Sequence, residues 1–131
     1  MNIIIADDDS NLLSMISAHL QSTGHGIVCV GDGNELFEKL KGFSADLVIL
    51  DINMPGLDGL AAFEKLRNLE DYKKIPAIIW SGLKIPESDT MSLKNQQVRF
   101  IKKPFNIAQL DALIKEITGP VILHNYDSYF S

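Results

Sequence analysis

The sequence predicts an α/β fold in which a parallel β-sheet is covered by helices on both faces. Two observations lead to this prediction. Apolar runs of strand length alternate along the chain with segments whose apolar residues recur at helical spacing. One of these runs, Leu47–Leu50, is apolar at every position, which is typical of a strand buried on both faces. Strands and helices in alternation imply right-handed crossovers that place helices on both sides of the sheet.

Five strands are expected, each a short run rich in isoleucine, valine or leucine. In chain order they are Asn2–Ala6, Ile27–Val30, Leu47–Leu50, Pro76–Trp80 and Val98–Ile101. Each run stops at a polar residue or a glycine, where the chain can turn. We therefore expect the strand ends to carry most of the polar side chains that lie near the sheet.

The segments after the strands have the apolar spacing of amphipathic helices, and each has a residue that can cap or start a helix. The expected starts are Asp9 or Ser10, Asn34, Asp58, Pro86 and Asn106. In each helix, the apolar residues at helical spacing are expected to face the sheet. In chain order these are Leu12, Leu13, Ile16, His19 and Leu20; Leu36, Phe37 and Leu40; Leu60, Phe63 and Leu66; and Ile107, Leu110, Leu113, Ile114 and Ile117. Whether Leu69 belongs to the third set is left open. Only Met91 and Leu93 are apolar in the segment 86–95, so we expect a loosely packed helix there.

Length and composition restrict the possible functions. The chain has 131 residues, enough for one domain, which we place at 1–118, followed by a C-terminal tail or linker stub at 119–131. The net charge is −5 and no basic stripe is present, so direct nucleic-acid binding is not expected. No apolar run is long enough for a membrane span and no secretory signal is evident, so we expect a cytoplasmic location and no membrane contact. The single cysteine, Cys29, is expected to be a buried structural thiol.

Polar side chains follow four of the five expected strands. Asp7 and Asp8 come after the first strand, Asp51 after the third, Ser81 after the fourth and Lys103 after the fifth. Because the carboxyl ends of parallel strands share one edge of a sheet, we expect these side chains to face a common rim. Three neighbouring carboxylates repel one another, and a hard divalent cation such as Mg²⁺ relieves that repulsion. With a hydroxyl and an ammonium opposite, the set has the composition of a phosphoryl-transfer site.

These residues resemble those of the receiver domain of two-component response regulators, which has the fold type of the chemotaxis response regulator. The resemblance covers about residues 1–118. It depends on four segments, Ala6–Asp9, Leu50–Gly59, Trp80–Gly82 and Lys103–Phe105, which occur in order and each at a strand end. It implies a flavodoxin-like, doubly wound (βα)5 fold with the sheet order 2-1-3-4-5.

The resemblance also implies a phosphorelay function. Asp51 would accept a phosphoryl group from the phosphohistidine of a sensor histidine kinase or a histidine phosphotransfer protein. Asp8, Asp51 and the backbone carbonyl of Asn53 would bind Mg²⁺, with Asp7 helping directly or through water. The chemistry would be self-phosphorylation and autodephosphorylation at Asp51, and not the turnover of an external substrate.

Further residues would make the switch. Ser81 and Lys103 would each bond a phosphoryl oxygen, and a cis bond before Pro104, frequent in the family, would direct Lys103 into the site. Phe100 occupies the position of the family's switch aromatic residue. The surface formed by the fourth helix, the fifth strand and the fifth helix would then change, so that a downstream protein or output domain reads it. Family members also form homodimers through this surface.

The sequence departs from the family pattern at several positions. Ser81 stands where threonine is commoner, Trp80 is bulky for a position beside the site, and Phe100 lacks the hydroxyl of the more frequent tyrosine. Positions 53 and 83 tune autodephosphorylation in the family. An apolar Leu83 cannot orient the attacking water, so we expect a longer-lived acyl phosphate than in the fastest members.

Two other functions remain open at this point. A pseudo-receiver would dock partners without phosphorylation, although the set of five site residues argues against it. A small phosphatase with an aspartyl nucleophile would usually carry that residue after the first strand, with a second aspartate two residues on; here Asp51 follows the third strand and Asn53 stands in the second place. Asp58 and Gly59 are interpreted structurally, as a helix cap and a point of close packing. The scattered His19, His25 and His124 indicate no metal site.

Overall fold

A computed structural model describes residues 1–83, 85, 87 and 97–119 of the chain. Five parallel strands form one sheet in the order β2-β1-β3-β4-β5. The strands are β1 (Asn2–Ala6), β2 (Gly26–Val30), β3 (Leu47–Asp51), β4 (Ala77–Ser81) and β5 (Val98–Lys102). The predicted flavodoxin-like fold and its strand order are therefore confirmed.

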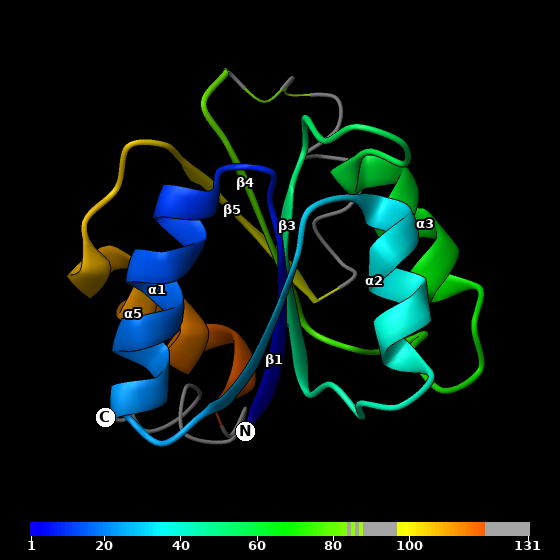
Figure 1. Cartoon of the computed structure of the whole chain (residues 1–131), viewed down its shortest axis with the longest axis horizontal. Coiled ribbons are helices and arrows are strands. Elements are labelled where there is room, and N and C mark those ends of the chain that lie inside the picture. Colours follow the sequence, from blue (N-terminus) through cyan, green and yellow to red (C-terminus); the bar gives the residue numbers. More distant parts are fainter. Residues whose placement is uncertain (84, 86, 88–96, 120–131) are drawn as a thin grey trace, which may run out of the picture.

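Helices cover both faces of this sheet. They are α1 (Ser10–Ser22), α2 (Gly33–Leu40), α3 (Gly59–Arg67) and α5 (Ile107–Thr118). Figure 1 shows the sheet edge-on, with α1 and α5 on one side and α2 and α3 on the other. Apart from Glu87, the helix expected at 86–95 lies outside the described residues, as does the predicted tail beyond Gly119. Within the described part, no helix has the length and apolar character needed to cross a membrane.

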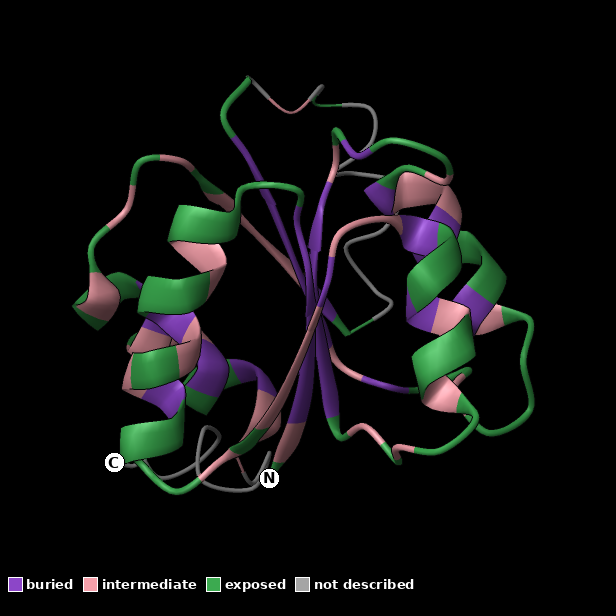
Figure 2. Cartoon of the chain, in the orientation of Figure 1, coloured by how far each residue is buried: buried purple, intermediate pink, exposed green. Residues whose placement is uncertain are grey.

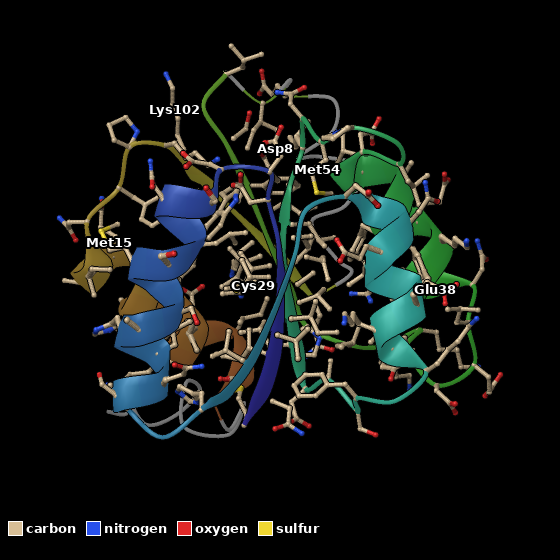
Figure 3. The ribbon with its side chains drawn as sticks, in the orientation of Figure 1. Asp8, Met15, Cys29, Glu38, Met54 and Lys102 are labelled. Atoms are coloured by element: carbon tan, nitrogen blue, oxygen red, sulfur yellow. The ribbon has the colours of Figure 1, made fainter. Side chains whose placement is uncertain are left out.

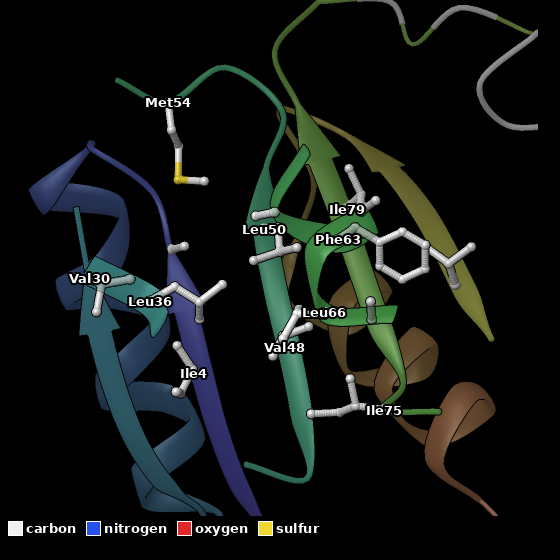
Figure 4. Close-up of a cluster of buried hydrophobic side chains, with 14 residues drawn as sticks. Ile4, Val30, Leu36, Val48, Leu50, Met54, Phe63, Leu66, Ile75 and Ile79 are labelled. Atoms are coloured by element: carbon white, nitrogen blue, oxygen red, sulfur yellow. The ribbon is translucent and has the colours of Figure 1, made fainter. Parts of the chain in front are cut away.

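Alternation along the central strands fills two hydrophobic cores. In β1, Ile3 and Ile5 belong to the core beneath α1 and α5, whereas Ile4 and Ala6 belong to the core beneath α2 and α3. Strands β3 and β4 are buried at every residue, as the uninterrupted apolar run at 47–50 predicts. Figure 2 shows this buried central sheet, and Figure 4 shows the core on the α2 and α3 side, with Phe63 and Leu66 contributed by α3.

Three predicted helix caps are confirmed. The side chain of Asp9 accepts hydrogen bonds from the backbone N–H groups of Asn11 and Leu12, and Asp58 caps α3 in the same way. Asn106 caps α5 and forms a reciprocal capping box with Gln109, a pairing that the sequence analysis missed although its three-residue spacing is the usual signature. Each carboxylate or amide oxygen satisfies N–H groups that the first helical turn leaves unpaired.

Two expected details are wrong, and the structure decides the open position of Leu69. Helix α2 begins at Gly33 and not at Asn34, because Asp32 extends its side chain to the backbone N–H of Glu35. Helix α3 ends at Arg67, so Leu69 lies beyond the helix and is exposed. Cys29 is only half-buried, since β2 is an edge strand. Burial raises the pKa of the Cys29 thiol, and a hydrogen bond with Ser17 offsets part of that rise.

Two of the three histidines are paired. The His19 ring on α1 lies 2.9 Å from the Asp111 carboxylate on α5, and the His25 ring lies 3.0 Å from the amino group of Met1. His124 lies outside the described residues. Among the described residues, the one group of three potential metal ligands contains neither His19 nor His25.

Gly59 brings the start of α3 into close contact with the end of β3. Its N–H donates to the carbonyl of Ile52 at 3.1 Å, and a Cβ atom placed on it would overlap the backbone carbonyl of Asp51.

We expect Gly59→Ala to lower the free energy of unfolding by about 1–3 kcal/mol, because a rigid backbone must move to admit the methyl group. Urea unfolding measures this loss. Gly42→Ala is the matched control, because no atom lies within 4 Å of its added Cβ; an equal effect of both substitutions would contradict the packing argument.

Candidate functional site

Four strand ends bring polar side chains to the same edge of the sheet. Asp7 directly follows β1, Asp51 and Ser81 are the last residues of β3 and β4, and Lys103 directly follows β5. The register of the parallel strands aligns these ends, with Asp51 opposite Trp80 and Ser81 opposite Lys102. Figure 3 shows the labelled side chains of Asp8, Met54 and Lys102 at this end of the molecule.

The three carboxylates predicted to gather do so. Ligand oxygens of Asp7, Asp8 and Asp51 all lie within 4.8 Å of one another, and this is the one group of three potential ligands within the described part of the chain. Asp7 and Asp51 are buried, whereas Asp8 is exposed. A cation could therefore reach the group from solvent and still contact two buried charges.

Lys103 is the cation that the described residues place against this group. Its Nζ atom lies 2.6 Å from Asp7 Oδ2 and 3.5 Å from Asp51 Oδ2. The bond between Lys103 and Pro104 is cis, as the resemblance suggested. One ammonium faces three carboxylates, so the cluster keeps an excess of negative charge. A hard divalent cation with oxygen ligands fits that excess and that donor set.

Two pKa values are shifted in the site. Burial raises the pKa of the Asp51 carboxyl, the charge of Asp7 adds to the rise, and Lys103 and the backbone N–H of Asn53 offset part of it. Burial by itself would lower the pKa of Lys103, but its hydrogen bonds and charge interactions with Asp7 and Asp51 outweigh burial and raise that pKa. The site therefore holds Lys103 charged, whereas Asp51 ionises at a free-energy cost.

This cost predicts how stability depends on pH. Because the pKa of Asp51 in the folded chain is raised above its ordinary value of 3.8, protonated Asp51 favours folding in acid, and that contribution is lost as the pH rises through the raised value. Asp51→Asn cannot ionise, so in EDTA it should raise the midpoint of thermal unfolding near neutral pH by several degrees. The gain should vanish in acid below the ordinary pKa of the carboxyl. An equal rise of the unfolding midpoint near neutral pH and in acid would contradict the raised pKa of Asp51.

The remaining predicted residues lie nearby in different settings. Ser81 is buried, and its Oγ accepts a hydrogen bond from the backbone N–H of Leu83 at 3.0 Å. The backbone N–H of Asn53 donates to Asp51 Oδ1 at 3.3 Å, and its side chain is exposed. Phe100 is half-buried and packs on the core beneath α2 and α3, so it does not join the carboxylate cluster. Lys102 is exposed, as expected for a solvated lysine.

Sequence reasoning missed the direct part that Trp80 takes in the site. Its indole Nε1 donates a hydrogen bond to Asp7 Oδ2 at 2.7 Å, and both residues are fully buried. The sequence marked Trp80 as bulky for its position, but the bond joins residues 73 positions apart. A signal was available: a tryptophan at the end of a strand beside acidic strand ends needs an acceptor for its N–H when it is buried.

Comparison with known proteins identifies the family. The sequence profile described as "Response regulator receiver domain" matches residues 3–115. The chain belongs to this family. Receiver domains act in two-component signal transduction, where they are partnered with histidine kinases. The cluster of Asp7, Asp8 and Asp51 is consistent with the phospho-accepting site of such a domain and could hold a metal ion.

Individual relatives agree with this assignment. The chain is 33% identical over 110 residues to the transcriptional activator protein PfeR of Pseudomonas aeruginosa, a match covering 84% of this chain and 35% of PfeR. The receiver domain of a signal transduction histidine kinase from Syntrophus aciditrophicus has 29% identity and a TM-score of 0.80, with 92% of this chain and 91% of that chain covered. The match to this chain therefore spans only about a third of the length of PfeR.

One solved receiver domain has been described with a metal ion. The receiver domain of the sensor histidine kinase PA1611 from P. aeruginosa has a magnesium ion coordinated in its active-site cleft. It shares 23% identity with this chain and has a TM-score of 0.77, and the match covers 91% of this chain and 98% of that one. At 23% identity, this similarity shows a shared fold and nothing further about this chain.

Proposed function

We propose that Asp51 accepts a phosphoryl group from a phosphohistidine, with Mg²⁺ bound at the acidic cluster. The donor would be a sensor histidine kinase or a histidine phosphotransfer protein. The observation that carries the proposal is the contact of Lys103 with both Asp7 and Asp51 inside a group of three carboxylates at one sheet edge. An attacking carboxylate, a mobile ammonium and oxygen ligands for a cation are the parts that phosphoryl transfer requires.

The covalent step uses Asp51 as the nucleophile. One carboxylate oxygen attacks phosphorus, a P–O bond forms and the P–N bond to the donor histidine breaks. The electron pair of that bond stays on the imidazole nitrogen, and the phosphoryl group becomes an acyl phosphate on Asp51. Burial and the neighbouring Asp7 disfavour the ionised form of Asp51, so its carboxylate is poised to lose charge density to phosphorus.

The ligands of the metal ion would be Asp8, Asp51 and the backbone carbonyl of Asn53, with Asp7 directly or through water. When bound, Mg²⁺ supplies positive charge for the phosphoryl oxygens. Lys103 would leave Asp7 Oδ2 for a phosphoryl oxygen, since its flexible stem carries a point charge that can change partners. The hydroxyl of Ser81, which at present accepts from Leu83, would turn to donate to another phosphoryl oxygen.

Phosphorylation of Asp51 would be passed on as a change in the conformation of one surface of the domain. A shift of Ser81 on β4 would be followed by Phe100 on β5. Phe100 is half-buried and lies opposite Ile79, two residues before Ser81. We infer that the segment 86–95, β5 and α5 form the surface that a downstream protein or output domain reads, and that two copies could pair through it. Phosphorylation would then select one of two conformations of this surface.

Removal of the metal ion tests the proposal. The chain should incorporate phosphate from acetyl phosphate in Mg²⁺. Incorporation should fall to background when EDTA is added, because Lys103, the one ammonium that the described residues place at the cluster, does not offset the charge of three carboxylates. Intact-mass spectrometry measures the fraction modified. The absence of any incorporation from acetyl phosphate and from a panel of phosphorylated histidine kinases would reject the proposal in favour of a docking module that works without phosphorylation.

A further inference from the structure

Trp80 is held rigidly beside the acidic cluster. It is the residue before Ser81 on β4, it is fully buried, and it belongs to the core beneath α1 and α5. Its ring stacks on Phe105 with the centroids 5.2 Å apart and the planes at 27°. Phe105 follows Lys103 and Pro104, so the indole packs on the same loop that carries the lysine. The direction of the indole N–H is therefore fixed by packing.

The indole N–H of Trp80 is one of three donors that orient the Asp7 carboxylate. Asp7 Oδ2 accepts from Trp80 Nε1 at 2.7 Å and from Lys103 Nζ at 2.6 Å, while Oδ1 accepts from the backbone N–H of Asp9 at 2.8 Å. A carboxylate offers about four positions for such bonds, so three are used and one remains. Asp7 has no exposed surface and depends on these donors to stay oriented.

The two donors to Oδ2 differ in their effect on a cation. Lys103 carries a positive charge, which opposes the binding of a second cation nearby. Its Nζ also lies over the Trp80 ring at 5.6 Å from the centroid, within the range of a cation–π contact. Trp80 is a neutral donor: it orients the carboxylate and leaves its negative charge available to a cation. When Lys103 moves to a phosphoryl oxygen, Trp80 is the side-chain donor that stays on Oδ2.

We propose that Trp80 is a positioning residue that fixes the Asp7 carboxylate through its indole N–H and thereby strengthens the binding of a divalent cation at Asp7, Asp8 and Asp51. This inference rests on the proposed function. Outer-shell hydrogen bonds of this kind change metal affinity by about 10–100-fold when they are removed. A tryptophan that merely fills the core would support the fold and leave the affinity for the metal unchanged.

A single-atom change tests this role. The chain contains one tryptophan, so growth on an analogue alters Trp80 alone. β-(3-Benzothienyl)alanine replaces the N–H by sulfur and keeps the bicyclic shape, whereas 5-fluorotryptophan keeps the N–H and is the matched control. Calorimetric titration with Mg²⁺, in the absence of any phosphoryl donor, should give a dissociation constant about 10-fold higher for the sulfur analogue. Equal constants for the two proteins would overturn the proposal.

A second comparison shows whether Trp80 acts through Asp7. In the Asp7→Asn background, exchange of the N–H for sulfur should change the dissociation constant by less than about twofold, because the charge that the N–H orients is gone. A loss as large as that in the wild-type background would assign Trp80 a general structural effect and overturn the proposal. If the sulfur analogue unfolds, Trp80→Phe, which lacks the N–H and keeps an aromatic ring against Phe105, replaces it in the same titrations.

The outcomes also separate this inference from the proposed function. If the 5-fluorotryptophan protein binds Mg²⁺ and is phosphorylated, and the sulfur analogue does both equally well, the positioning role fails and the proposed function stands. If the 5-fluorotryptophan protein neither binds Mg²⁺ nor is phosphorylated, the proposed function fails and the positioning role fails with it.

Discussion

Replacement of Asp51 by asparagine is expected to abolish phosphorylation of the chain by acetyl phosphate and Mg²⁺. The amide has nearly the shape of the carboxylate but lacks its nucleophilic oxygen, so the rate should fall by at least about 10³-fold. Unfolding is not the expected cause of the loss, because burial raises the pKa of Asp51 and the uncharged side chain should stabilise the metal-free chain near neutral pH. Intact-mass spectrometry after a fixed incubation measures the modified fraction.

Asp71→Asn is the matched control for this substitution. Asp71 is exposed and lies outside the acidic cluster, so the same chemical change there should leave labelling unaltered. Continued labelling of the Asp51→Asn protein at the wild-type rate would show that another residue is the nucleophile.

Replacement of Lys103 by methionine is expected to change both stability and reactivity. Methionine keeps most of the length of the side chain but leaves Asp7, which has no exposed surface, without its ammonium partner at 2.6 Å. Removing one partner of a buried ion pair costs about 3–5 kcal/mol, and the partial exposure of Lys103 favours the lower value. Urea unfolding in EDTA should therefore show a loss of about 3 kcal/mol.

Mg²⁺ should restore more stability to this variant than to the wild-type chain, because the metal then replaces the lost positive charge and meets no competing ammonium. The initial rate of phosphorylation should fall by about 10²-fold even in Mg²⁺, since a donor to the phosphoryl oxygens is missing. Lys102→Met, at an exposed position, should change neither property by a measurable amount. Equal stabilities of the two lysine variants in EDTA would contradict the ion pair with Asp7.

The fold could be predicted from the sequence because its strongest signals are local. The run 47–50 is apolar throughout, and β3 is buried on both faces, as that pattern requires. Helix starts at Asp9, Asp58 and Asn106 were visible as capping residues before apolar stripes. Helix α2 begins one residue before the predicted Asn34 because Asp32 caps it, and an aspartate before a glycine suits both a turn and a cap.

The site could be predicted in outline because the topology of a parallel sheet fixes where its strands end. Asp7, Asp8, Asp51 and Lys103 are far apart in the sequence, yet each follows a strand of the same sheet, so they meet at one edge. The positions of the strand ends are therefore enough to predict that these four side chains gather. The chemical roles of all the site residues are proposals. In the described part of the chain, the side chains of Asn53, Ser81 and Phe100 have no recorded hydrogen bond to the three carboxylates, and Phe100 packs on the core beneath α2 and α3.

The contacts that involve shape could not be predicted from the sequence. The bond from Trp80 to Asp7 depends on the rotamer of a buried ring, and the ring position depends on Phe105 in a loop 25 residues later. The fit of Gly59 against the carbonyl of Asp51 depends on the angle at which α3 approaches β3. Both are set by tertiary packing, which residue spacing does not specify.

The most direct test of the account is to locate the phosphoryl group on the chain. An acyl phosphate on aspartate is reduced by borohydride to homoserine, which peptide mass spectrometry can place in the sequence. After incubation with a phosphorylated histidine kinase and Mg²⁺, the account predicts homoserine at position 51 and at no other aspartate. Homoserine at a different aspartate, or a chain that is phosphorylated without yielding homoserine, would contradict it.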